Sequence, residues 1–245
     1  MWKNIFRRSG GSKVRKTVRV DNPVDALPYA YWIEKEPLRL LLPVGMLRMQ
    51  GAFAYDRDHP FVQALDHGPE RLAAFYSRFQ PGSLGAMYGL PARGRAGETL
   101  PPWELPWVLR DSRTAPAGEG GLPAGHGVSF YGPVSREKIA MEYGRLRKTA
   151  ASIAAHGYQP DRYRDIEGHL MTDGHDVCFF VRGGKHRAAV LAWQGLEHIP
   201  VQFRRTWPLV VDSRTGGHWP LVADGSVDAG LARDILTVYL RGNHV

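Results

Sequence analysis

Hydrophobic and polar residues form a helical pattern in the second half of the chain. Ser135 is a residue type that caps helix N-termini, and Gly157 suits the left-handed position just past a helix end. Between them, apolar side chains recur three or four residues apart, which predicts one amphipathic helix. The apolar positions of this helix are Ile139, Tyr143, Leu146, Ala150 and Ile153.

A hairpin is predicted directly after that helix. Asp173-Gly174 is a dipeptide that favours tight turns between antiparallel strands, and it separates runs near 166–171 and 176–182 that have strand character. A further helix at 186–194 is then expected to end at Gly195.

The remaining pattern completes a mixed α/β domain. Ile199, Val201 and Phe203 alternate with other residues as in a strand, and apolar residues over about 227–240 predict a last helix. The domain is expected to span 128–205, and 206–245 is expected to be a C-terminal extension with a helical piece that packs against it.

The first half is less regular. Residues 21–110 form an aromatic- and proline-rich N-terminal region, and its clearest element is a helix at about 69–79 that begins at Pro69 and is closed by Pro81. Residues 111–127 contain five Gly and two Pro and no aromatic residue, which predicts a linker or loop.

Charge is concentrated at the N-terminus. The net charge is +8, but residues 1–20 hold seven basic and no acidic side chains, while the rest of the chain carries 25 basic and 24 acidic residues. We expect 1–20 to be a basic, disordered tail, with anionic lipid or nucleic acid as the partner if it binds. No secretory segment follows the tail, so we expect a cytoplasmic protein. Cys178 is the single cysteine, which rules out an internal disulfide.

The run CFFVRGGKHRAAV at 178–190 carries the clearest chemistry. An apolar strand meets the Gly183-Gly184 turn, and Lys185, His186 and Arg187 open the next helix. A helix N-terminus presents backbone N–H groups and a positive dipole end, and the three side chains add donors at the same point. This combination is typical of a phosphate site.

This stretch resembles the ParB/sulfiredoxin superfamily, whose corresponding turn reads GGCHR in sulfiredoxins, GERR in ParB proteins and DG-x-HR in free-serine kinases. The spacing from Gly184 to Pro200 matches without a gap, and RLRKTAASIAAHGYQP is similar to the helix-and-turn segment of ParB proteins. The resemblance covers about 130–205. It implies a ParB/sulfiredoxin-like mixed-sheet domain that binds ATP or another NTP with Mg²⁺ through Gly183, Gly184, Lys185, His186 and Arg187.

Three positions that differ from or only roughly match the family motifs bear on which reaction is expected. Lys185 stands where sulfiredoxins place their catalytic cysteine, so sulfinic acid reduction is not expected. Gly183 stands where the serine kinases carry an aspartate base, and Glu137 roughly matches a functional glutamate of those kinases, although its place at a helix start equally suits a dipole role. Glu137 and His186 are our candidate catalytic residues.

The function expected from these features is nucleotide binding, with NTP hydrolysis or kinase-like transfer of a phosphoryl group to an unidentified small-molecule acceptor. Two alternatives remain open at this point. One is a non-enzymatic, ParB-like nucleotide-responsive or nucleic-acid-binding module, although Ala189 replaces the later arginine of ParB proteins. The other is an accessory protein held at a membrane surface by the basic tail.

Overall fold

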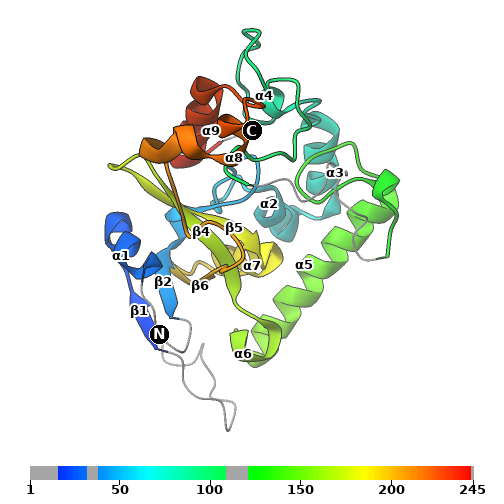
Figure 1. Cartoon of the computed structure of the whole chain (residues 1–245). Coiled ribbons are helices and arrows are strands. Elements are labelled where there is room, and N and C mark those ends of the chain that lie inside the picture. Colours follow the sequence, from blue (N-terminus) through cyan, green and yellow to red (C-terminus); the bar gives the residue numbers. More distant parts are fainter. Residues whose placement is uncertain (1–15, 32–37, 109–120, 244–245) are drawn as a thin grey trace.

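The computed structural model describes residues 16–31, 38–108 and 121–243, which fold around one mixed β-sheet (Figure 1). Seven strands of the described residues form this sheet, in the order β1-β2-β6-β4-β5-β3, with β7 also paired to β4. The strands are β1 (Thr17–Arg19), β2 (Arg39–Pro43), β3 (Leu47–Arg48), β4 (Ile166–Thr172), β5 (Val177–Gly183), β6 (His198–Phe203) and β7 (Val210–Asp212). The mixed α/β class predicted from the sequence is therefore confirmed.

The central strand β4 organises the sheet. It pairs antiparallel with β5 along one edge. Along its other edge, its first part pairs parallel with β6 and its last part pairs parallel with β7. The N-terminal strands join the same sheet, because β2 lies antiparallel to β6 and β3 lies parallel to β5.

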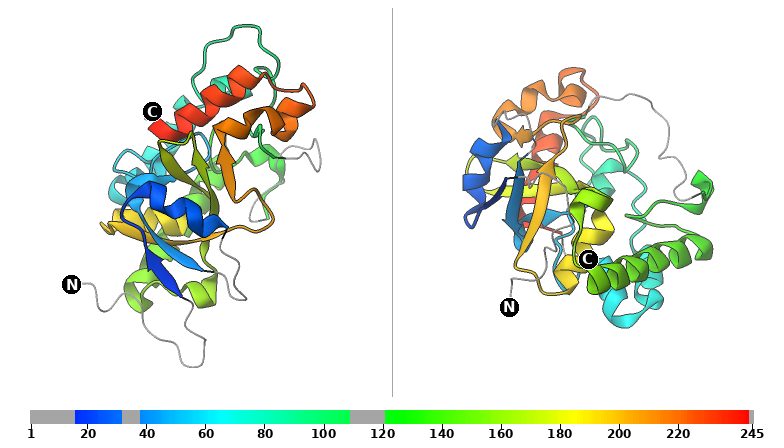
Figure 2. Two further views of the ribbon diagram at one scale, coloured as in Figure 1. Left: turned by 60° about the vertical axis from the view of Figure 1, so that its left-hand side comes forward. Right: turned by 90° about the horizontal axis from the view of Figure 1, so that it is seen from below.

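Helices cover both faces of the sheet. The longer ones are α2 (Pro60–His67), α3 (Pro69–Arg78), α5 (Arg136–His156), α7 (Lys185–Trp193) and α9 (Ala229–Arg241), and the single-turn ones are α1 (Leu27–Ala30), α4 (Leu84–Met87), α6 (Pro160–Tyr163) and α8 (Pro220–Ala223). Helices α2, α5 and α7 pack against one another, whereas α9 packs on β4 and β5. The two views in Figure 2 place α8 and α9 together on a different side of the sheet from α5.

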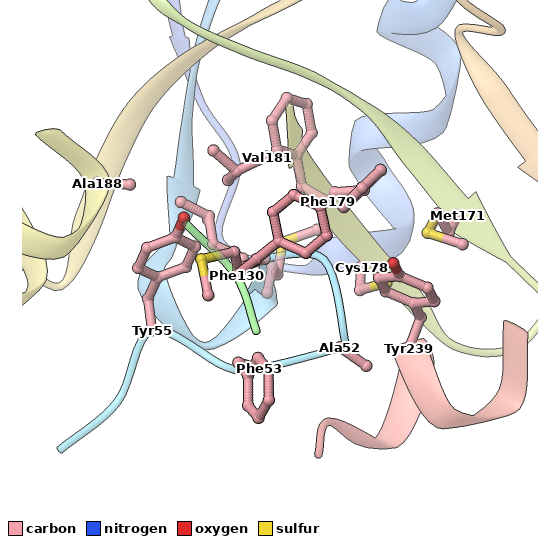
Figure 3. Packing of buried hydrophobic residues seen from close by; sticks show 14 of the residues in the cluster. Ala52, Phe53, Tyr55, Phe130, Met171, Cys178, Phe179, Val181, Ala188 and Tyr239 are labelled. Carbon is pink, nitrogen blue, oxygen red and sulfur yellow. The ribbon is translucent and has the colours of Figure 1, made fainter. Parts of the chain in front are cut away.

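The hydrophobic core lies on both faces of β5. Phe180 contacts Tyr239 of α9 edge to face, with ring centroids 5.2 Å apart. Figure 3 shows Cys178 beside Tyr239, and Val181 on the side where Ala188 of α7 lies. Side chains therefore alternate between the two helical layers along the strand. The last residues of β5 lead directly into α7.

The predicted elements of the second half are confirmed. Ser135 caps α5 by accepting a hydrogen bond from the backbone N–H of Lys138, and Gly157 follows the last turn with a φ of 73°. The β4–β5 pair is antiparallel on either side of Asp173-Gly174. The predicted helix at 69–79 corresponds to α3.

The structure differs from the expected boundary of the basic tail. Thr17–Arg19 forms β1 and pairs parallel with β2, and Val20 is buried. β-Branched residues at 17, 18 and 20 suit an edge strand, which explains why the fold begins before residue 21. Residues 1–15 of the tail and 109–120, which include most of the predicted linker, lie outside the described residues.

No helix within the described ranges is long and apolar enough to span a bilayer.

Candidate functional site

The Gly183-Gly184 turn joins β5 to α7 as the sequence predicted. Gly184 is the N-cap of α7 and adopts a φ of 82°, and no side chain caps the helix start. A Cβ on Gly184 would lie 2.9 Å from Nη2 of Arg187 and 3.1 Å from Cα of Ile166. Only glycine fits there without strain, whereas a Cβ on Gly183 would make ordinary contacts of 3.6 Å or more.

A pocket of about 630 Å³ opens at this turn, between α5 and α7. Its lining includes five cationic side chains and His186, and none of the described residues that line it is acidic. The cations are Arg145, Lys148, Arg182, Lys185 and Arg187. Ser129, Thr149 and Ser152 add hydroxyl groups. The wall is completed by Tyr163, whose ring is exposed. Because the lining is strongly positive and rich in donors, the pocket is suited to an anionic ligand.

A buried carboxylate lies behind this pocket. Glu142 on α5 is fully buried, and its Oε2 accepts a hydrogen bond from Nε2 of His186 at 2.6 Å. Its Oε1 lies 2.9 Å from Nζ of the equally buried Lys138 and 3.3 Å from Nη1 of Arg145. Glu142 thus contacts three cationic or protonatable side chains, and two of them, His186 and Arg145, line the pocket.

The charge state of Glu142 follows from these contacts. Burial alone would raise the pKa of its carboxyl group, but the hydrogen bond and charge of His186, followed by those of Lys138, outweigh burial and lower the pKa to about 2. Glu142 is therefore ionised at neutral pH. The His186 ring is also stacked on Phe61, with centroids 5.1 Å apart and planes 3° apart. With Nε2 engaged by Glu142, a ligand contact by His186 has to be made through Nδ1.

Arg187 has a structural role that the sequence did not indicate. Its Nη1 donates hydrogen bonds to the backbone carbonyls of Tyr163 and Arg164, and its Nη2 donates to that of Asp165. These carbonyls belong to the last residue of α6 and the two residues before β4, so Arg187 ties the α6–β4 connection to the start of α7. The guanidinium still lines the pocket, but a phosphate would share its donors with three carbonyls.

The other predicted binding residue with a side chain at the turn is Lys185. Its Nζ lies 4.7 Å from the centroid of the Phe130 ring, a cation–π contact, and the residue lines the pocket. Gly183, Gly184, Lys185, His186 and Arg187 are thus held within one turn, and the last four of them line the cavity.

Glu137 is placed apart from the other predicted site residues. It lies in the first turn of α5 with an exposed side chain, and its Oε2 is 3.8 Å from Nδ1 of His126. It does not line the pocket. Hydrogen bonds from its own backbone and from Ser135 lower the pKa of Glu137. The carboxylate in contact with His186 is Glu142.

Two kinds of chemistry find no support among the described residues. Cys178 is buried within β5, and burial raises the pKa of its thiol to about 12, so it is protonated at neutral pH. The described part of the chain also contains no group of three His, Cys, Asp or Glu side chains placed to hold a metal ion.

No protein-family model matches the chain. The curated proteins and the solved structures give no match either.

Proposed function

We propose that the protein binds a nucleoside triphosphate, ATP or another NTP, in the pocket between α5 and α7. The observation that carries this proposal is the charge of the lining. Among the described residues, five cations and no acidic side chain surround a cavity at the N-terminus of α7. A volume of about 630 Å³ lies within the range of small-molecule and cofactor sites. The resemblance of GGKHR to the phosphate turn of the ParB/sulfiredoxin superfamily points the same way.

The residues present fit a polyphosphate. Backbone N–H groups in the first turn of α7 suit one phosphate group, while Lys185 and the α5 side chains Arg145 and Lys148 supply charge to the others. Tyr163 offers an exposed ring for stacking against a base. Because the described residues of the lining include no carboxylate, Mg²⁺ would be held by the phosphates and water.

The chemistry that this arrangement favours is hydrolysis of the nucleotide or transfer of its terminal phosphoryl group to a small-molecule acceptor. A bound NTP with Mg²⁺ supplies the transferable group. The protein's part is to position the phosphates and neutralise their charge. Glu142 holds His186 in a fixed orientation at the rim, and Nδ1 is then the ring atom that contacts phosphate or accepts a proton from the acceptor hydroxyl.

Nucleotide binding is tested by thermal unfolding and calorimetry with ATP, CTP, GTP and UTP, with and without Mg²⁺. A ligand at 100 times its Kd stabilises the folded state by about 2.7 kcal/mol, and each kcal/mol raises the Tm of a chain of this size by roughly 2–4 °C. We expect one or more nucleotides to give such a shift. If none stabilises the protein, the proposal is refuted.

A matched pair of variants locates the site. Lys148 lines the pocket, whereas its neighbour Arg147 is exposed and does not. Lys148→Met should weaken nucleotide binding about tenfold or more, the value of one charged hydrogen bond, and Arg147→Met should leave it unchanged. Equal effects of the two substitutions would place the nucleotide elsewhere. Salt-sensitive binding of single-stranded DNA without any mononucleotide binding would favour a nucleic-acid-binding module instead.

A further inference from the structure

A second, larger cavity adjoins the pocket between α5 and α7, which we call the phosphate pocket. It has a volume of about 820 Å³ and is walled by four tryptophans, Trp103, Trp107, Trp207 and Trp219. Apolar side chains such as Leu105 and Val211 complete much of the wall. The cavity is therefore large enough for a ring-sized organic molecule and offers it aromatic side chains to pack against, beside polar ones.

Arg182 connects the two cavities. It is the one residue that lines both of them among those described. Its Nη1 donates to Oε1 of Gln50 at 3.2 Å, and its guanidinium carbon lies 4.2 Å from the centroid of the Trp207 ring. The charged end of Arg182 is thus held by an amide and an indole at the boundary between the phosphate pocket and the tryptophan-lined cavity.

Arg182 lacks a countercharge within the described part of the chain. No carboxylate there forms an ion pair with it. The ionisable groups that face it are Tyr239, Tyr88, Arg204 and the buried His169. Burial raises the pKa of both tyrosines, so their hydroxyls are neutral. A half-buried cation without an anionic partner is unfavourable in the empty protein, and a bound anion would relieve that penalty.

We infer that the tryptophan-lined cavity binds a small organic anion, with its apolar, ring-sized body among the tryptophans and its anionic group on Arg182. If the nucleotide occupies the phosphate pocket as proposed above, on which this part of the inference rests, this anion is the acceptor substrate. Arg182 then lies between the phosphates on one side and the acceptor on the other. The lining contains Arg205 as a second cation and Glu104 as its one acidic residue among those described.

Three probes separate the features of the ligand. 1-Naphthoate has both the apolar body and the negative charge, 1-naphthalenemethanol has the body alone, and acetate has the charge alone. Titration calorimetry on the full-length protein should show binding of naphthoate at least tenfold tighter than either of the others. If the neutral alcohol binds as tightly as naphthoate, the pairing with Arg182 is wrong.

Variants separate this cavity from the phosphate pocket. Trp103→Leu and Arg205→Met change residues that line only the tryptophan cavity, and the second lies on the surface, so the fold should tolerate it. Each should weaken naphthoate binding several-fold and leave nucleotide binding unchanged. Trp193→Phe is the control, because Trp193 donates to Asp66 at the far end of α7 and lines neither cavity.

The opposite dissociation completes the test. Lys148→Met should leave naphthoate affinity unchanged and weaken nucleotide binding about tenfold or more. If naphthoate instead competes with nucleotide, and its affinity responds to Lys148→Met but not to Trp103→Leu, the anion binds in the phosphate pocket and the inference is overturned. If the wild-type protein binds naphthoate but no nucleotide, the proposed function is refuted and this cavity assignment stands.

Discussion

The substitution Glu142→Gln tests whether one buried carboxylate holds the site together. It leaves the side-chain shape nearly unchanged and removes the negative charge next to Lys138 and His186. Lowering the pKa of Glu142 from an ordinary 4.5 to about 2 corresponds to roughly 3 kcal/mol of stability, at about 1.4 kcal/mol for each tenfold change in proton affinity. Removing one partner from a buried ion pair costs about 3–5 kcal/mol in other proteins.

The pH dependence of this effect has a defined sign. Because the folded state holds the Glu142 proton less tightly than the unfolded state, the stabilisation is fully present above pH 4.5 and is lost as the pH falls toward 2. Urea denaturation followed by circular dichroism should therefore show the variant about 3 kcal/mol less stable than the wild type at pH 7. The difference should shrink between pH 4.5 and the lowest pH at which both proteins still fold.

Two further variants make the test specific. Glu137→Gln, which removes an exposed carboxylate from the same helix, should change the free energy of unfolding far less. The double variant Lys138→Met/Glu142→Met replaces the buried pair by apolar groups and should recover part of the lost stability. A Glu142→Gln protein within about 1 kcal/mol of wild type at pH 7, or one whose deficit grows on acidification, would show that the carboxylate does not hold these charges.

Further substitutions test other parts of the structure. Gly184→Ala should destabilise the fold by about 1–2 kcal/mol because of its left-handed φ, whereas Gly183→Ala should be tolerated in the same thermal assay. Arg187→Ala should weaken nucleotide binding by about 1.5–3 kcal/mol. It should also lower the Tm, because it removes hydrogen bonds to three carbonyls. Wild-type nucleotide affinity in the folded variant would exclude a contact between Arg187 and phosphate. Cys178→Ser should leave nucleotide affinity unchanged, and in the wild type the thiol should react with Ellman's reagent only on unfolding. Burial lowers the pKa of His169 to about 3, so its contribution to stability should fall as the pH drops below about 6.5, and His169→Phe should reduce this acid sensitivity in urea titrations.

Local patterns predicted the Gly183-Gly184 turn well because its geometry is a local property. Two adjacent glycines between an apolar strand and an apolar helix leave few conformations for the chain, and the structure has the expected left-handed residue at Gly184. The hairpin at Asp173-Gly174 was predictable for the same reason. The contributions of β2 and β3 to the sheet were not, because each pairs with a strand more than a hundred residues away, and such pairing leaves no mark in local periodicity. β1 joins the sheet by pairing with β2.

The sequence analysis did not identify Glu142, the buried carboxylate behind the pocket, for a different reason. The apolar stripe predicted for the helix after Ser135 ran through Ile139 and Tyr143, yet the buried face of α5 runs through Lys138, Glu142 and Leu146. Lys138 and Glu142 were not among the predicted core positions, because a lysine and a glutamate four residues apart usually lie on the exposed face of a helix. The sequence did contain a sign of their burial. Glu142 and Lys138 lie about one and two helical turns before the predicted core residue Leu146, and therefore on the same face of the helix.

The partners of the cations at the pocket differ in how fully they offset the positive charge. Arg145 and His186 contact Glu142, Arg187 donates to three carbonyls, and the guanidinium of Arg182 lies over the ring of Trp207. Carbonyl dipoles and aromatic rings stabilise a cation only partly, whereas a carboxylate neutralises it. Among the described residues, Glu142 therefore offsets charge at Arg145 and His186, while positive potential remains at Arg187 and at Arg182, where the two cavities meet.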